Sequence, residues 1–377
     1  MRTGRFGILI IAFTFLIAAS ASAATYGQTG FQIDWWRGED GAKGVQYFIP
    51  IEAGGDIEQF SFKVLTAQVY NRIDPDDRPM RKFEGFVDTR LNLAYELVNQ
   101  WPVDLLLALD FNLPTGKTGL TATQAISISD PDKVTITRMG EGFNTNPSLS
   151  LLKQWDALLA TVGVGYIWRG EYDATDELTD YDPGDALNLT AEVDYNFSPR
   201  WLGRLFGSYT RFDTDQQDGE DFYEPGDVST MGAGLNYPRA QWELGASFQA
   251  IFRDTEKRQD WSGVMLTEEH NSYGDEWIAG INGRVQLSDR IDLKAWAQYK
   301  YIAANDYPPE DYVYYQSNRE KSSLGAELAM RLAAHWEAGL RLQGYSMRVG
   351  DYERYYGVDP GADFDGGTAA LWITGRF

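Results

Sequence analysis

The triplet His270-Asn271-Ser272 places a histidine two residues before a serine. Residues two apart share a face of an extended strand, so His270 is positioned to deprotonate the Ser272 hydroxyl and create a nucleophile for hydrolysis. Glu276 follows as a third polar group. The apolar set that continues this segment occupies the odd positions, so the triplet's even positions lie on the opposite, polar side. We therefore expect no enzymatic activity from it.

Carboxylates are concentrated in long polar segments, notably 173–185, 213–227 and 351–365. The chain has 33 Lys+Arg against 55 Asp+Glu, a formal net charge of −22. Divalent cations bind several carboxylate oxygens, so a cation site is one interpretation and a solvated anionic surface is the other. No run has EF-hand spacing, and the chain has two His and no Cys. We expect neither a metal nor a cofactor, and the acidic balance argues against a nucleic-acid partner.

A second set of charged residues recurs at every other position of otherwise apolar segments. Between 83 and 97, Leu91 and Leu93 stand at odd positions, and Asp88, Arg90 and Glu96 stand at even ones. In a β-strand the two sets lie on opposite faces. The same alternation recurs in 103–112, 187–195, 242–253, 291–300, 324–332 and 369–377. We therefore predict an all-β chain whose strands have one apolar and one charged face.

Three features favour a transmembrane antiparallel up-and-down β-barrel over a soluble β-sandwich. Short connections alternate with long acidic ones, as short periplasmic turns and long extracellular loops do in outer-membrane barrels. Aromatic residues gather toward both ends of the strands, as at two membrane interfaces. The last strand ends in Phe377, which resembles the signal read by the barrel assembly machinery. The tryptophans beside the short turns are Trp101, Trp155, Trp201, Trp242 and Trp336.

Residues 1–23 have the pattern of a secretory signal peptide. Arg2 and Arg5 precede an apolar run over 7–19, and Ala21-Ser22-Ala23 supplies small residues for cleavage. Residues 24–377 would then form a single barrel domain. We count fourteen strands between 56 and 377, and a hairpin of 31–36 with 46–51 would raise the total to about sixteen. Fourteen remains the alternative.

A barrel of about sixteen strands is too wide for side chains alone to fill. Its inward charges then either line an aqueous pathway or pair internally, and the long segment 114–146 is placed to fold inward and narrow the lumen. For an open lumen, we expect arginines facing carboxylates to set solute selectivity. These lumen-lining candidates are Arg90, Arg204, Arg284, Arg341, Asp88, Asp110, Glu192 and Glu327.

The strand at 103–113 runs directly into the turn Leu113-Pro114-Thr115-Gly116-Lys117. The proline ends the strand's hydrogen-bond ladder and the glycine permits the turn. A strand that ends in this turn resembles the outer-membrane family linked to the MetA pathway of phenol degradation. The resemblance implies an exported barrel that moves small, often aromatic, compounds, and it implies no catalytic residue.

We thus expect a bacterial outer-membrane channel for passive diffusion or uptake of small solutes, and the resemblance implies that aromatic compounds are among them. Outer-membrane lipid and lipopolysaccharide would surround it, and the barrel assembly machinery would bind Phe377. One alternative is a closed barrel that binds a partner through its loops. The other is a lipid-hydrolysing barrel that uses His270 and Ser272.

Overall fold

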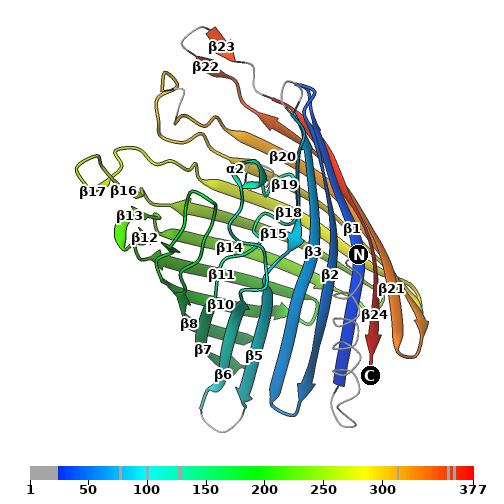
Figure 1. Cartoon of the computed structure of the whole chain (residues 1–377). Helices are drawn as coiled ribbons and strands as arrows, with labels where there is room; N and C mark the ends of the chain where they lie inside the picture. Colours follow the sequence, from blue (N-terminus) through cyan, green and yellow to red (C-terminus); the bar gives the residue numbers. More distant parts are fainter. Residues whose placement is uncertain are drawn as a thin grey trace, which may run out of the picture.

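The computed structural model describes residues 24–75, 79–98, 102–125, 130–311, 314–354, 357–359 and 362–377. They form a closed antiparallel β-barrel (Figure 1), which confirms the predicted all-β transmembrane architecture. Each wall strand pairs with its neighbours in the sequence, and the first strand pairs with the last. The wall strands are β1 (Ala24–Gly38), β2 (Lys43–Ile57), β3 (Phe60–Asp74), β4 (Arg81–Phe86), β5 (Thr89–Leu97), β6 (Asp104–Leu113), β7 (Asn144–Trp155), β8 (Leu158–Arg169), β10 (Ala186–Ser198), β11 (Trp201–Phe212), β14 (Val228–Pro238), β15 (Trp242–Arg253), β18 (Glu276–Ser288), β19 (Ile291–Ile302), β20 (Arg319–Ala333), β21 (Trp336–Val349) and β24 (Phe364–Arg376).

The strand count depends on β4 and β5, which both pair with β3. The outer half of β3 pairs with β4 and the other half pairs with β5, so the two are segments of one wall position. The barrel therefore has sixteen wall positions, as predicted. The expected first hairpin is β1–β2, and Gly41 in its turn has φ of 86°, which a glycine adopts without strain.

The outer surface of the wall carries the apolar half of the alternating pattern. Leu324 is 68% exposed and Ile281 is 64% exposed, and in the membrane these side chains face lipid. Exposed aromatic side chains mark both ends of the strands, with Trp155 near a short turn and Trp168 near a long loop. Trp101 lies outside the described residues. The chain is thus built for an outer membrane, where this class of barrel resides.

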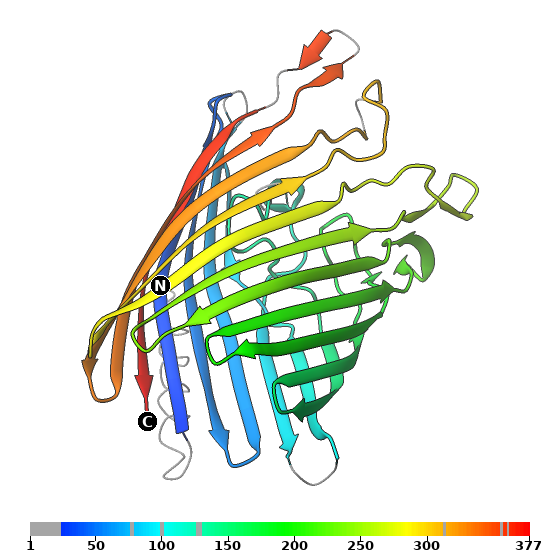
Figure 2. The ribbon, with the colours of Figure 1, turned by 180° about the vertical axis from the view of Figure 1, so that it is seen from behind.

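The long connections extend from one end of the barrel (Figure 2), and they contain strands of their own. Three of the connections together form a five-stranded sheet in the order β17-β16-β13-β12-β9. These strands are β9 (Tyr181–Asp182), β12 (Asp215–Gln217), β13 (Glu220–Glu224), β16 (Lys257–Gln259) and β17 (Met265–Thr267), and a separate pair is β22 (Tyr352–Arg354) with β23 (Gly357–Asp359). The sequence pattern predicted the loops but not this sheet.

The seam between β1 and β24 closes at the end of the barrel that carries the short turns. The backbone amide of Thr25 donates to the carbonyl of Phe377 at 2.9 Å, and the reverse bond is 2.8 Å. The Phe377 ring packs edge-on against Trp336. The proposed signal peptide, residues 1–23, lies outside the described residues.

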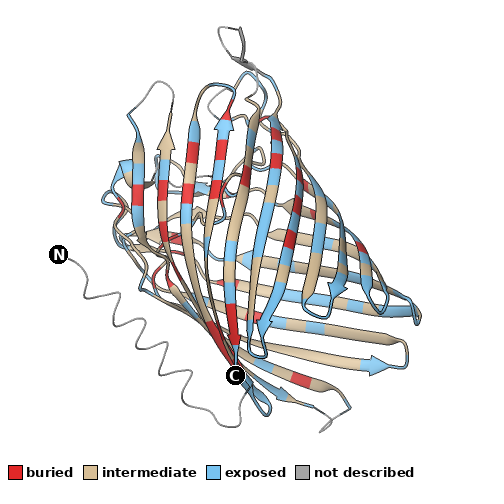
Figure 3. Ribbon diagram, turned by 90° about the vertical axis from the view of Figure 1, so that its right-hand side faces the viewer, coloured by how far each residue is buried: buried red, intermediate tan, exposed pale blue. Residues whose placement is uncertain are grey.

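The connection between β6 and β7 spans residues 114–143. Its described residues enter the barrel rather than extend outward, and they include the short helix α2 (Ala122–Ala125), as Figure 1 shows. We call its described residues, 114–125 and 130–143, the inserted segment. Figure 3 shows buried positions, in red, along the wall strands. The buried residues include Asp34 on β1, Gln46 on β2, Val69 on β3 and Tyr345 on β21. Among the described residues, no helix is long and apolar enough to cross a membrane.

Candidate functional site

The inserted segment begins and ends at the break between β4 and β5. Asp88 lies in this break and is only 5% exposed. Its carboxylate accepts hydrogen bonds from the backbone amides of Gly116 and Glu141, both at 2.7 Å, and from Asn112 Nδ2 at 2.6 Å. The Asp88 amide in turn donates to the carbonyl of Met139 at 2.9 Å. Asp88 therefore ties the start and the end of the segment to the wall.

The Leu113–Lys117 turn supplies the other half of this attachment. The amide of Lys117 donates to the carbonyl of Phe86 at 3.1 Å, and the amide of Thr89 donates to Thr115 Oγ1 at 2.8 Å. A Cβ atom on Gly116 would stand 2.5 Å from the Met139 carbonyl oxygen. Only glycine fits this close approach, which gives the turn motif a physical reason.

The far end of the inserted segment is bound to the wall formed by β1 and β2. The Thr135 amide donates to Asp34 Oδ2 at 2.9 Å, and the Ile136 amide donates to Gln46 Oε1 at 2.8 Å. Gln46 Nε2 returns a bond to the Ile136 carbonyl at 2.8 Å. Asp34 is 1% exposed and Gln46 is fully buried. Two wall side chains thus satisfy the segment's backbone as a neighbouring strand would.

Ion pairs fix the same region to β19 and β20. Asp130 Oδ2 lies 2.6 Å from Arg319 Nη1, and Asp132 Oδ1 lies 3.0 Å from Lys300 Nζ. Lys321 Nζ donates to the Asp132 carbonyl. Lys300 also contacts Glu276 at 2.9 Å. The side chains of these ion pairs are partly or largely buried. The pairs are therefore less screened by water, and stronger, than exposed surface ion pairs.

Lys133 is enclosed between aromatic rings at this attachment. Its Nζ lies 3.3 Å from the Phe364 ring centroid and 4.6 Å from that of Trp36. Burial lowers the pKa of Lys133 to about 8, although Asp130 acts in the opposite direction. The next residue, Val134, packs in an apolar cluster with Trp36, Tyr345 and Met347. The segment is therefore held by apolar packing as well as by charge.

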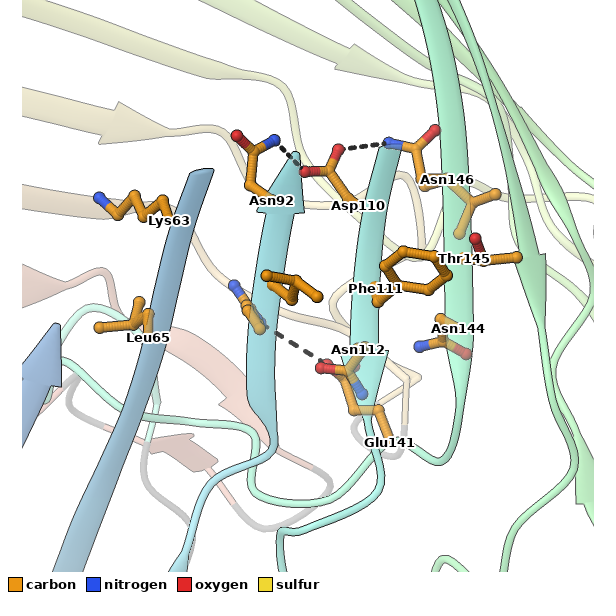
Figure 4. Close-up of a pocket in the computed structure, with 13 residues that line it drawn as sticks. Lys63, Leu65, Asn92, Asp110, Phe111, Asn112, Glu141, Asn144, Thr145 and Asn146 are labelled. Atoms are coloured by element: carbon orange, nitrogen blue, oxygen red, sulfur yellow. Dashed lines mark hydrogen bonds and ion pairs between the residues drawn. The ribbon is translucent and has the colours of Figure 1, made fainter. Parts of the chain in front are cut away.

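A cavity of about 420 Å³ remains on the wall beside the inserted segment (Figure 4). Its polar floor consists of two rows of directly opposed residues on β5, β6 and β7. One row is Asn92, Asp110 and Asn146, and the other is Arg90, Asn112 and Asn144. Other lining residues are Lys63, Leu65, Glu141 and Ile167.

Hydrogen bonds order this floor. Asp110 accepts from the amides of Asn92 and Asn146, the latter at 3.3 Å. Glu141 Oε1 lies 2.8 Å from Arg138 Nη1, and Glu141 Oε2 lies 3.8 Å from Arg90 Nη2. Lys63 Nζ lies 3.0 Å from Glu52. These contacts fix the positions of the polar groups on the cavity floor.

Two of the candidate arginines contact candidate carboxylates in the structure. Arg204 contacts Glu192 at 3.3 Å and Asp194 at 2.8 Å. Arg341 contacts Glu327 at 2.6 Å, and Lys294 approaches the same carboxylate at 3.3 Å.

The remaining candidates have other partners. Arg284 pairs with Asp292 at 3.1 Å. Arg90 and Asp110 line the cavity, whereas Asp88 is buried in the attachment of the inserted segment. The eight candidates therefore lie in separate clusters on the wall, and only Arg90 and Asp110 share the cavity.

Sequence reasoning missed the residues that hold the inserted segment. Asp130, Asp132 and Lys133 stand in a polar connection with no periodic pattern, and their partners are more than 150 residues away along the chain or near its start. In the sequence, the one feature that marks these residues is the pair of aspartates that flank Pro131 in an otherwise weakly charged stretch. That signal indicates a turn but not its position in space.

The residues considered for hydrolysis lie in the long connection before β18. The His270 ring packs at a tilt against the Tyr307 ring, with 5.1 Å between the ring centroids, and Asn305 Nδ2 donates to the Ser272 carbonyl at 3.4 Å. Among the described residues, no hydrogen bond joins His270 to Ser272. Glu276 instead pairs with Arg253 at 2.7 Å.

Acidic residues of the long loops accept hydrogen bonds within and beside the five-stranded sheet that these loops form. Asp215 is 3% exposed and accepts from the Tyr181 hydroxyl at 2.6 Å and the Gly184 amide at 2.8 Å. Burial raises the pKa of Asp215. Glu256 accepts from the Tyr223 hydroxyl at 2.6 Å in the same way. No group of three or more metal-ligating side chains occurs in the part of the chain that the structure describes.

The closed barrel, its apolar outer face and its inserted segment define the class: an outer-membrane β-barrel protein. Residues 39–267 match the family described as "Putative MetA-pathway of phenol degradation". The chain belongs to this family, as its Leu113–Lys117 turn indicated. No curated protein is significantly similar to the chain.

Several solved outer-membrane proteins are similar to the chain at low identity. OpdO of Pseudomonas aeruginosa is 9% identical with a TM-score of 0.47, over 94% of this chain and 98% of that one. An anion-selective porin from Comamonas acidovorans is 11% identical with a TM-score of 0.43, over 94% and 99%. A Pseudomonas aeruginosa FadL homologue is 13% identical with a TM-score of 0.42, over 94% and 90%. These identities carry no function to this chain.

Proposed function

We propose that the protein is a passive outer-membrane channel for small solutes, narrowed by the inserted segment. The observation that carries the proposal is the segment's position inside the barrel, attached to the wall at Asp88 on one side and at Asp34 on the other. Because the wall holds the segment at these points, the segment can narrow a wide lumen without being a stable folded unit by itself.

The remaining cavity supports passage of small molecules. Its volume of about 420 Å³ is within the range of about 300–1,000 Å³ typical of small-molecule sites. The amide and charged groups of its polar floor can replace the water molecules that surround a polar solute. The family description adds aromatic compounds as the solute class to test first.

Contacts outside the lumen belong to the same proposal. Phe377 ends the closing strand and is 45% exposed, so its side chain is accessible to the barrel assembly machinery. The outward apolar band would contact lipid, and the acidic loops would contact lipopolysaccharide through bridging cations.

Single-channel recording in a planar bilayer tests the channel. We expect steady openings with ion selectivity from the refolded protein, and a larger conductance after residues 118–137 are replaced by a short Gly-Ser linker. Silence from both forms, when circular dichroism and heat-modifiable migration show them folded, would contradict the channel and favour a closed barrel that binds a partner.

A Ser272→Ala variant separates the channel from an enzyme. The variant should conduct as the unaltered protein does, because Ser272 lies outside the cavity. Lipid hydrolysis by the unaltered protein that disappears in this variant would instead support the enzyme.

A further inference from the structure

The cavity beside the inserted segment contains an arginine whose charge is incompletely matched. The Arg90 side chain is 65% exposed, and its ion-pair partner among the described residues is Glu141, at 3.8 Å. Arg138, which is 75% exposed, approaches the same carboxylate more closely, at 2.8 Å. Two guanidinium groups therefore share one carboxylate, and Arg90 is the more weakly paired of the two.

Two other carboxylates lie nearby and are hydrogen-bonded to uncharged donors. Asp88 has three such donors, and Asp110 has the side-chain amides of Asn92 and Asn146. Among the described residues, neither forms an ion pair with Arg90. A guanidinium has five N–H donors, and its geometry matches a carboxylate.

The residues around Arg90 provide the rest of a site. Asn144 lies opposite Asn112 and two strands from Arg90 in the same row. Its Oδ1 accepts from the Gly170 amide at 3.3 Å, and its Nδ2 has no hydrogen-bond partner within the described ranges. Leu65 stands directly opposite Arg90 on β3, and Ile167 lies on the other side of the cavity. The cavity thus combines a cation and an amide donor with the apolar side chains of Leu65 and Ile167.

We propose that this cavity binds a small organic carboxylate with a compact apolar body. The carboxylate contacts Arg90 and Asn144 Nδ2, and the apolar body lies against Leu65 or Ile167. The inference rests on the proposed channel function and names its solute class. Glu141 competes with the solute for the two arginines, which keeps binding weak enough for release.

Benzoate and benzamide are suitable probes because they have the same shape and differ in charge. Titration calorimetry on the detergent-folded protein should show benzoate binding more tightly than benzamide. Arg90→Gln should weaken benzoate binding about tenfold and leave benzamide binding unchanged. Arg348→Gln is the matched control, since Arg348 is 75% exposed with a carboxylate 3.8 Å away and lies outside the cavity.

A second variant excludes misfolding as the explanation. Glu141→Gln keeps the backbone bond to Asp88 and removes the competing carboxylate, so benzoate should bind several-fold more tightly. Equal binding of the two probes, or no effect of Arg90→Gln and Glu141→Gln, would overturn the site.

Recording separates this outcome from failure of the channel itself. A folded barrel that binds benzoate but never conducts would support the site and contradict the channel. A conducting barrel that binds neither probe would contradict the site alone.

Discussion

Asp132 of the inserted segment and Lys300 of β19 form an ion pair with 3.0 Å between Oδ1 and Nζ, although 168 residues separate them in the sequence. Both side chains are largely buried, at 8% and 20% exposure. The pair joins a connection between β6 and β7 to a wall built near the other end of the chain. The lumen therefore has a constriction whose position depends on a few distant contacts.

Replacing Asp132 by Asn should loosen that constriction. Lys300 retains Glu276 as a partner, so the barrel remains folded while the segment loses about 2 kcal/mol of attachment. We expect higher mean conductance and greater open-channel noise in bilayer recordings. Asp74→Asn, which alters an exposed pair with Lys43, is the control and should leave both quantities unchanged. An unaltered current from Asp132→Asn would show that the segment is held without this pair.

Asp88→Ala should lower the stability of the whole barrel. It removes a buried acceptor with three donors and leaves the amides of Gly116 and Glu141 without partners. Each such bond to a charged group contributes about 1.5–3 kcal/mol, so we expect a loss of at least about 3 kcal/mol. The urea midpoint of the heat-modifiable folded form measures this. A midpoint equal to that of the unaltered protein would refute the anchoring role of Asp88.

Attachment of the segment should strengthen as pH rises from 8 to 10. Lys133 has its ordinary pKa of 10.5 when released and a pKa of about 8 when attached, so the released state binds more protons in this window. Raising the pH therefore favours the attached state. Deprotonation of Lys133 removes the free-energy cost of burying a charged amine in that state. The flanking Asp130 and Asp132 and the ring contacts of Trp36 reduce that cost.

The measurement is open-channel noise against pH, which should fall between pH 8 and 10. Lys133→Met retains the chain length without the charge and should show low noise across the whole range. If open-channel noise in the unaltered protein rose with pH, attachment would weaken rather than strengthen on deprotonation of Lys133. That result would contradict the prediction.

Glu327→Gln should change both selectivity and stability. Glu327 is 6% exposed and pairs with Arg341 and Lys294, so the substitution leaves two cations sharing a neutral amide. We expect the reversal potential in a KCl gradient to shift toward anions and stability to fall by about 3 kcal/mol. Asp292→Asn, beside Arg284 in a more exposed pair, should cost less than about 1 kcal/mol. Equal costs for the two substitutions would show that burial of Glu327 is unimportant.

The strands were predictable because their side chains alternate over ten residues or more. The β1–β2 hairpin followed from an Asp-Gly turn, and Phe377 indicated the closing strand. Local patterns sufficed for these elements, since each strand pairs with its neighbour in the sequence.

The inserted segment was less predictable because its partners are distant. Its length and position suggested that it could enter the lumen, but no local pattern links Asp130 to Arg319 or Thr135 to Asp34. Asp88 was assigned to the lumen by its even position, and the structure places it in the break between β4 and β5. Its carboxylate does point inward, but the inserted segment covers it, and parity alone does not reveal this cover.

The walls that receive the inserted segment come from the two ends of the chain, β1 and β2 on one side and β19 to β21 on the other. Those walls become adjacent only when β1 pairs with β24. The segment therefore finds its full set of partners late in assembly, after the most sequence-distant pairing has formed. We therefore expect an incompletely assembled barrel to have a wide lumen. The lumen becomes narrow when β1 pairs with β24 and closes the barrel.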